Sequence, residues 1–134
     1  MYSIMTDFNY IVDRFDDIQI LRYQVPGFEM LPVDQKLYIY YLNQAALAGR
    51  DILWDQHYKH NLTIRNVCEA IYNNYTDDKE NPDFIFFVAY LKKIWMSNGI
   101  HHHYSMDKFI PTCFQNFFFE QINKLSPDQI PLQA

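Results

Sequence analysis

Five histidines are the residues whose chemistry first suggests a site, and three are consecutive: His101, His102 and His103. Zinc favours imidazole nitrogen, and three histidines with one water molecule form a known type of catalytic zinc site. Neighbouring side chains, however, point to opposite faces of a strand or spread apart around a helix. We therefore do not expect the triplet to converge on one ion. We interpret it as three polar aromatic side chains that line a loop or a cleft.

The other two histidines, His57 and His60, are about one helical turn apart, and two histidines alone make a weak metal site. A zinc-binding helix of the H-E-x-x-H type needs a glutamate directly after its first histidine. No histidine in this sequence is followed by glutamate. We therefore assign no catalytic residue, metal ligand or cofactor to this chain.

The remaining candidate groups are interpreted as structural. Cys68 and Cys113 are the only cysteines and form no C-x-x-C pair, which predicts two reduced, buried thiols. No serine lies in a G-x-S-x-G turn, and the sequence has no glycine-rich phosphate loop. Arg50 and Asp51 follow a patch of small residues, where we expect a buried ion pair that orients two helices.

Composition limits the classes of partner. The chain has 134 residues, of which 49% are apolar and 20% charged, as expected for a globular domain with its own core. Its net charge is −5, and its 11 Lys and Arg residues are scattered, which argues against nucleic acid and anionic membranes as partners. No apolar run reaches the roughly 20 residues of a membrane helix. No signal peptide is visible, so we expect a soluble protein and leave its compartment, cytoplasmic or periplasmic, open.

Hydrophobic periodicity predicts a mostly α chain of about four to five packed helices with one short N-terminal strand. Apolar residues at helical spacing predict a short helix within residues 1–16. Alternation from Asp17 to Val25 predicts the strand, which Pro26-Gly27 ends. Because a lone strand is unstable, this segment either lies extended against helices or, as we expect, has its sheet partners outside this chain.

A long helical stretch begins at Val33. We expect it to bury one face, formed by Tyr38, Tyr41, Leu42, Ala45, Ala48 and Ile52.

Five capping signals mark the helices that follow this stretch. The capping signals are Asn61 and Asn81-Pro82 at helix starts, Gly99 at a helix end, Thr112 to Gln115 as a capping box, and Ser126-Pro127 at a last start. Pro131 cuts that last helix short, and we expect the natural chain to continue past Ala134.

Three stretches together resemble one known family. They are Asp13 to Phe28 (DRFDDIQILRYQVPGF), Leu42 to Asp55 (LNQAALAGRDILWD) and Trp95 to Pro111 (WMSNGIHHHYSMDKFIP). They resemble the N-terminal region of the dipeptidyl peptidase III family of zinc metallopeptidases, most closely its bacterial, Bacteroides-like branch. The resemblance is collinear from about Phe8 to Leu132.

The resemblance implies a two-lobed α+β enzyme that removes dipeptides from peptide N-termini. A helical lobe would hold zinc, and its motif has a histidine-glutamate pair and a second histidine on one helix and a further glutamate on a later helix, with a motif glutamate acting as base. Neither the zinc ligands nor the catalytic glutamate is in this chain. The other lobe would contain a small β-barrel that pairs with the extended peptide. Residues 1–134 would then be one helical subdomain at the start of that second, non-zinc lobe. Its partners would be the rest of the same polypeptide and, in the complete enzyme, the peptide substrate.

We hypothesise that the loop within Asn98 to Pro111 borders the cleft between the lobes of such an enzyme and helps to shape it. The candidate cleft-lining residues are Asn98, Gly99, His101, His102, His103, Tyr104 and Lys108. Two other functions stay open: an independent helical module that binds proteins without catalysis, and a small metal-binding protein that uses its histidines.

Overall fold

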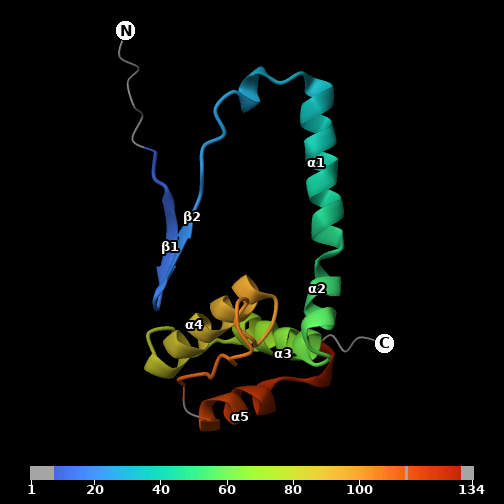
Figure 1. Cartoon of the computed structure of the whole chain (residues 1–134). Helices are drawn as coiled ribbons and strands as arrows, with labels where there is room; N and C mark the ends of the chain where they lie inside the picture. The colour runs from blue at the N-terminus through green and yellow to red at the C-terminus, as the bar shows by residue number, and fades with distance from the viewer. Residues whose placement is uncertain (1–7, 114, 131–134) are drawn as a thin grey trace. The chain divides into compact units, whose positions relative to one another are not determined.

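The computed structural model describes residues 8–113 and 115–130. These residues form one β-hairpin, five α-helices and two 3₁₀ turns (Figure 1), which confirms the mostly helical class. The chain divides into two compact units, Met1–Gln44 and Ala45–Ala134. The elements in chain order are β1 (Ile11–Phe15), β2 (Ile18–Leu21), η1 (Phe28–Met30), α1 (Val33–Ala48), α2 (Arg50–His57), α3 (Asn61–Asn74), α4 (Pro82–Ser97), α5 (Gln115–Lys124) and η2 (Pro127–Gln129).

The hairpin corrects two sequence predictions. Residues Ile11–Phe15 form a strand where a helix was predicted, and β1 pairs antiparallel with β2, Phe15 opposite Ile18. The periodicity misled because apolar residues four apart, such as Ile11 and Phe15, fit the spacing of a strand as well as that of a helix. Strand β2 therefore has a partner within the chain on one edge, and it is shorter than the predicted Asp17-to-Val25 strand. Part of the predicted N-terminal helix, residues 1–7, lies outside the described residues.

The turn between the two strands has a local cause. Asp16 adopts a left-handed φ of 51°, a conformation that aspartate tolerates better than most residues. This lets the chain reverse between Phe15 and Ile18 with only two intervening residues.

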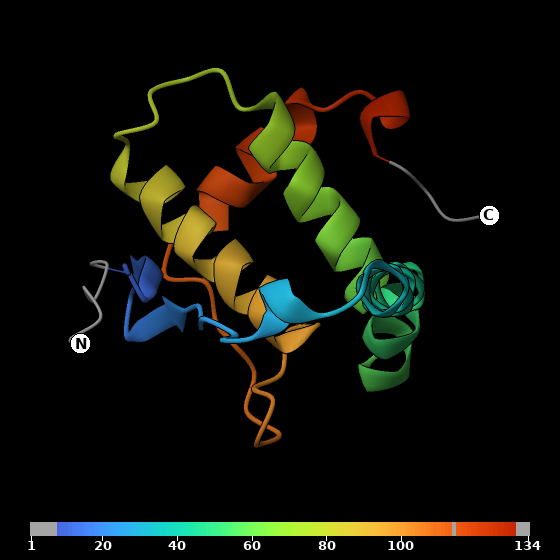
Figure 2. The same cartoon turned by 90° about the horizontal axis from the view of Figure 1, so that it is seen from above.

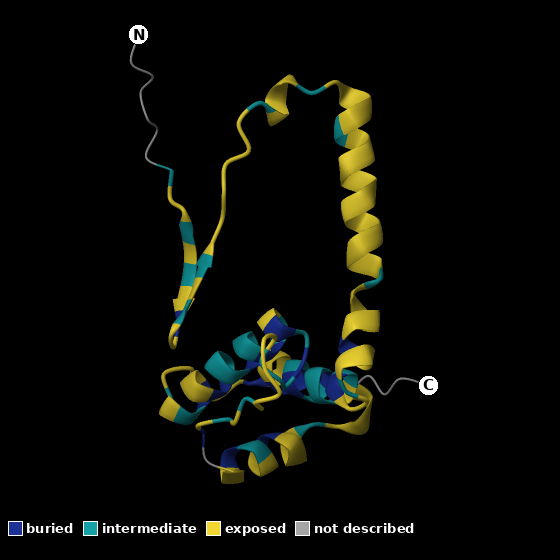
Figure 3. Ribbon diagram, viewed as in Figure 1, coloured by how far each residue is buried: buried dark blue, intermediate teal, exposed yellow. Residues whose placement is uncertain are grey.

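Helix α1 is formed as predicted, but its apolar side chains are exposed. None of its residues is buried, and Figure 3 shows exposed residues along its length. The predicted buried face is therefore wrong for the described residues: Tyr38 is 66% exposed and Tyr41 65%. Leu37, Ile39 and Tyr40, on other sides of the helix, are exposed too. Residues 37–42 are apolar on every side of the helix, which is typical of a segment buried inside a larger structure.

Residues 45–134 form a small helical unit around α3, which contacts α2, α4 and α5 (Figure 2). The apolar residues of α3 and α4 repeat at helical spacing and form one stripe on each helix, in which Ile71, Phe87, Leu91 and Ile94 are almost fully buried. Burial of each such side chain contributes roughly 1.5–3 kcal/mol. The core is joined by α2 through Trp54, which is 0% exposed.

The end of α4 differs from its prediction by one residue. Helix α4 begins at Asn81-Pro82 as predicted, with the Asn81 Oδ1 accepting the Asp83 N–H at 2.9 Å. At its other end the left-handed cap is Asn98, not Gly99. Gly99 has a φ of 151°, and a Cβ there would lie 2.2 Å from the Nδ2 of Asn61. Glycine is thus required for close approach to Asn61.

The other predicted helix starts have mixed outcomes. Helix α3 begins at Asn61 with His60 as its cap, so Asn61 is not the capping residue. Helix α5 begins at Gln115, where the predicted capping box ends, but Phe114 within that box lies outside the described residues. Ser126-Pro127 starts a short 3₁₀ turn in place of an α-helix.

Replacing Gly99 with Ala should destabilise the helical unit by about 3 kcal/mol or more, because the new Cβ adds a clash to a strained φ. Asn61 cannot move away without losing its own hydrogen bonds. Urea unfolding followed by fluorescence of Trp54 and Trp95 measures the change. Gly49→Ala is the matched control, since its φ is −84° and its Cβ would make only ordinary contacts. Equal, small costs at both positions would contradict this account.

Candidate functional site

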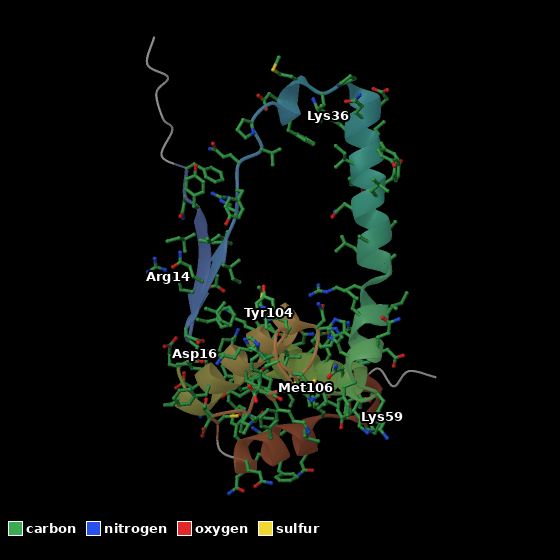
Figure 4. The ribbon with its side chains drawn as sticks, in the orientation of Figure 1. Arg14, Asp16, Lys36, Lys59, Tyr104 and Met106 are labelled. Carbon is green, nitrogen blue, oxygen red and sulfur yellow. The ribbon has the colours of Figure 1, made fainter. Side chains whose placement is uncertain are left out.

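Residues 100–109, here called the histidine loop, form a closed loop after α4. His101 and Lys108 form an antiparallel bridge. The Phe109 N–H donates to the Ile100 carbonyl, and the His102 N–H to the Asp107 carbonyl, each at 2.8 Å. The tip projects Tyr104 and Met106, each 87% exposed and labelled in Figure 4. The backbone thus forms a defined loop with an apolar, exposed tip.

The three consecutive histidines separate into two environments. The His101 ring packs edge-on against Tyr58, with centroids 5.6 Å apart. The His102 and His103 rings stack at 4.6 Å, and Tyr104 lies 4.0 Å from the His103 ring. Neighbouring side chains can stack in this way because the segment is neither a regular strand nor a helix. The His102 Nδ1 accepts the Tyr104 N–H at 3.2 Å, which occupies one ring nitrogen.

No metal is assigned to this loop. Within residues 8–113 and 115–130, no three His, Cys, Asp or Glu side chains are grouped so that they could hold a metal ion. We therefore derive no chemical step through a metal ion at this loop.

The start of the histidine loop is fixed by residues far away in sequence. The Asn61 Oδ1 accepts the Ile100 N–H at 3.2 Å, while its Nδ2 donates to the Trp54 carbonyl at 3.1 Å. Arg50 donates to the Trp95 carbonyl at 3.3 Å and to the Asn98 Oδ1 at 3.5 Å. Ends of α2, α3 and α4 are therefore joined directly at the base of the loop.

The seven predicted cleft-lining residues all lie in or next to this loop. Gly99 is buried against Asn61, and Asn98, His101 and His102 are half-buried. The others, His103, Tyr104 and Lys108, are exposed. Two cavities among the described residues lie elsewhere, beside α5. The residues are thus brought together, and their contact with a cleft stays a prediction. Sequence reasoning did not identify Asn61 as their anchor, because Asn before a helix usually indicates a cap.

An ion pair joins α2 to α3, as the sequence suggested, but with different geometry. Asp51 pairs with Arg65 at 2.6 Å, and this hydrogen bond lowers the pKa of the Asp51 carboxyl. The Asp51 side chain is 54% exposed, so the expected burial is wrong. Arg65 also lies 5.1 Å from the Trp54 ring, and Glu69 accepts the Trp95 indole N–H at 2.9 Å. These contacts orient α2 relative to α3 and hold the Asp51 carboxylate in an ion pair with Arg65.

Both thiols are free and buried, as predicted. Burial raises the pKa of Cys68 to about 12, and it also raises the pKa of Cys113. Because the thiolate is the reactive form, neither sulfur is set up as a nucleophile.

Comparisons with known proteins assign no family. A scan of the chain against protein-family models finds no match, and a search of the curated proteins finds none either. The resemblance to dipeptidyl peptidase III therefore stays a prediction. Among the described residues, no helix is both long enough and apolar enough to cross a membrane.

The raised pKa of Cys68 predicts slow alkylation of the native chain. With a pKa of about 12 in place of 9.0, the thiolate fraction at pH 8 falls about 10³-fold. Iodoacetamide should therefore label Cys68 slowly until denaturant is added, as measured by mass spectrometry. The raised pKa also makes stability depend on pH. Between pH 9 and 12 the Cys68 thiol ionises in the unfolded chain but not in the folded one, so the free energy of unfolding falls as pH rises. Fast labelling of Cys68 without denaturant would contradict its burial.

Proposed function

We propose that this chain is the N-terminal structural part of a zinc-dependent dipeptidyl peptidase and is inert by itself. The observation that carries the proposal is α1, whose apolar side chains are exposed all round. Such a helix needs surrounding protein to bury it. The resemblance of the chain to dipeptidyl peptidase III supplies the identity of that protein: the remainder of the same polypeptide.

The positions of the three resembling stretches support the proposal. Asp13 to Phe28 covers the hairpin turn, β2 and the start of η1. Leu42 to Asp55 and Trp95 to Pro111 contact each other, because Arg50 of the first donates to Trp95 and Asn98 of the second. Residues that carry the resemblance therefore include those that hold the histidine loop in place.

In the proposed enzyme this chain shapes the substrate cleft and takes no part in the chemistry. Zinc would polarise the scissile carbonyl and activate water from ligands in the other lobe. The histidine loop would border the cleft, with Tyr104 and Met106 available for contact. The second edge of β2, unpaired within the described residues, is available to further strands of a barrel.

An independent helical interaction module is the second candidate. The exposed face of α1 favours it as well, since a separate protein could cover the same side chains. The two candidates differ in the size of the natural product and in its activity.

The first test is the natural gene product. An antibody against the 134-residue chain should detect a protein several times longer. After purification, that protein should release dipeptides from peptide N-termini, lose the activity to a chelator and regain it with zinc. Mass spectrometry of the products measures this, and the isolated chain is the inactive control. A natural product of 134 residues would favour the interaction module, and zinc-independent release by a longer product would contradict the proposal.

The cleft position of the histidine loop has its own test. In the complete protein, replacing His101, His102 and His103 with Ala should raise KM about 3–10-fold with little change in kcat, because binding is lost but no reacting group. Steady-state kinetics measures both constants. The double variant His57→Ala/His60→Ala is the control, since those histidines lie outside the loop. An unchanged KM and kcat in the triple variant would remove the loop from the cleft.

A further inference from the structure

The tip of the histidine loop is tied to His102 by two hydrogen bonds, and one of them ends on a titratable group. The Ser105 N–H donates to the His102 backbone carbonyl at 3.2 Å, and the Tyr104 N–H donates to the His102 Nδ1 at 3.2 Å. An imidazole nitrogen accepts a hydrogen bond only while it carries no proton. When the ring gains a second proton, both of its nitrogens become donors and the bond from Tyr104 is lost.

The neighbouring histidine adds a second dependence on protonation. The His102 and His103 rings stack with their centroids 4.6 Å apart and their planes at 23°. Two neutral rings pack favourably at this separation, whereas two imidazolium rings carry like charges and repel each other. Protonation of the pair therefore weakens the stack as well as the hydrogen bond to Tyr104.

The charged groups around the loop add to this effect. The titratable or charged groups that flank it are Tyr104, Asp107 and Lys108 in the loop, and Arg50, Tyr58 and His60 on α2 and at the start of α3. The Asp107 carboxylate already accepts the Ser105 hydroxyl at 3.0 Å. One carboxylate thus stands against two permanent cations, Lys108 and Arg50, and each proton gained by the histidines increases the excess of positive charge.

The base of the loop does not depend on a titratable side chain. The Phe109 N–H donates to the Ile100 carbonyl at 2.8 Å, and the Ile100 N–H donates to the Asn61 Oδ1 at 3.2 Å. Backbone and side-chain amides keep the same protonation state over the range in which histidine titrates. The base should therefore persist when the tip is released.

We propose that His102 is a pH-sensitive latch for the tip of the histidine loop, residues 103–106. The neutral ring holds the Tyr104 N–H and stacks on His103, and the protonated ring releases both while the base of the loop stays in place. Tyr104 and Met106, each 87% exposed and labelled in Figure 4, move with the tip. Any contact that they make with another molecule therefore becomes dependent on pH. The latch does not rest on the proposed peptidase function, because all of its groups belong to the 134-residue chain.

NMR of the ¹⁵N-labelled chain tests the latch over the range from about pH 8 to about pH 5, in which histidine commonly titrates. At the upper end, long-range proton–nitrogen spectra should place the single His102 ring proton on Nε2. As the ring gains its second proton, the exchange protection of the Tyr104 amide should fall at least about fivefold after correction for intrinsic exchange, as expected for the loss of one hydrogen bond. The Phe109 amide at the base of the loop is the internal control and should keep its protection.

Two variants separate the acceptor from the charge. In His102→Asn the side-chain oxygen can replace Nδ1 as the acceptor but cannot titrate, so the Tyr104 amide should stay protected at acid pH. In His102→Phe a ring remains without an acceptor, so the Tyr104 amide should be unprotected throughout the pH range. The helix signals of each variant show whether it stays folded, and the wild-type titration stands without them.

Four results would overturn the proposal. The first is a Tyr104 amide that keeps its protection while His102 gains its proton. The second is an equal loss of protection at acid pH in His102→Asn, which would assign the pH dependence to another group such as Asp107. The third is a parallel loss at Phe109, which would show that the whole loop opens. The fourth is a protected Tyr104 amide in His102→Phe, which would show that the bond to Nδ1 does not hold the tip.

Discussion

The buried amide of Asn61, at the start of α3, ties α2 to the histidine loop. Its two ends join the carbonyl of Trp54 at the end of α2 to the N–H of Ile100 at the start of the histidine loop. Each bond contributes about 1 kcal/mol. Loss of the amide would remove the acceptor of the Ile100 N–H, while the Trp54 carbonyl would keep only its bond from the Tyr58 N–H. The backbone of Gly99 fits against this side chain, where no Cβ can be placed. The histidine loop takes this position because Asn61 and Gly99, which are 38 residues apart in the sequence, meet at this point.

This contact also explains which parts of the structure the sequence could predict. The stripes on α3 and α4 follow from local periodicity, and the Asn81-Pro82 start follows from capping chemistry. Asn61 was misinterpreted because its partners, Trp54 and Ile100, are defined only by the fold. The hairpin was missed for a different reason: its apolar spacing fits a helix and a strand equally well, and pairing with β2 decides between them.

The exposed apolar surface of α1 sets the main constraint on function. Side chains such as Leu37, Tyr38 and Tyr41 cost free energy in water, and this sequence keeps them on several sides of one helix. A solvent-exposed helix of a monomer would carry polar residues on its outer side. The helical unit behaves differently, because Phe87, Leu91 and Ile94 are covered by neighbouring elements. The two units thus differ in how they bury apolar side chains, because the cluster of buried core residues lies in the second unit.

The functional groups of the chain also divide into two kinds: those that the fold buries or pairs, and those that are exposed. The thiols are buried with raised pKa values, and Asp51 is engaged by Arg65, so these groups complete the fold. The groups left open are of another kind: Tyr104 and Met106 at the tip of the histidine loop, and the exposed apolar side chains of α1. Exposed aromatic and apolar side chains of this kind can be covered by other molecules or by other parts of a larger protein, whereas the buried thiols resist the ionisation that nucleophilic attack requires.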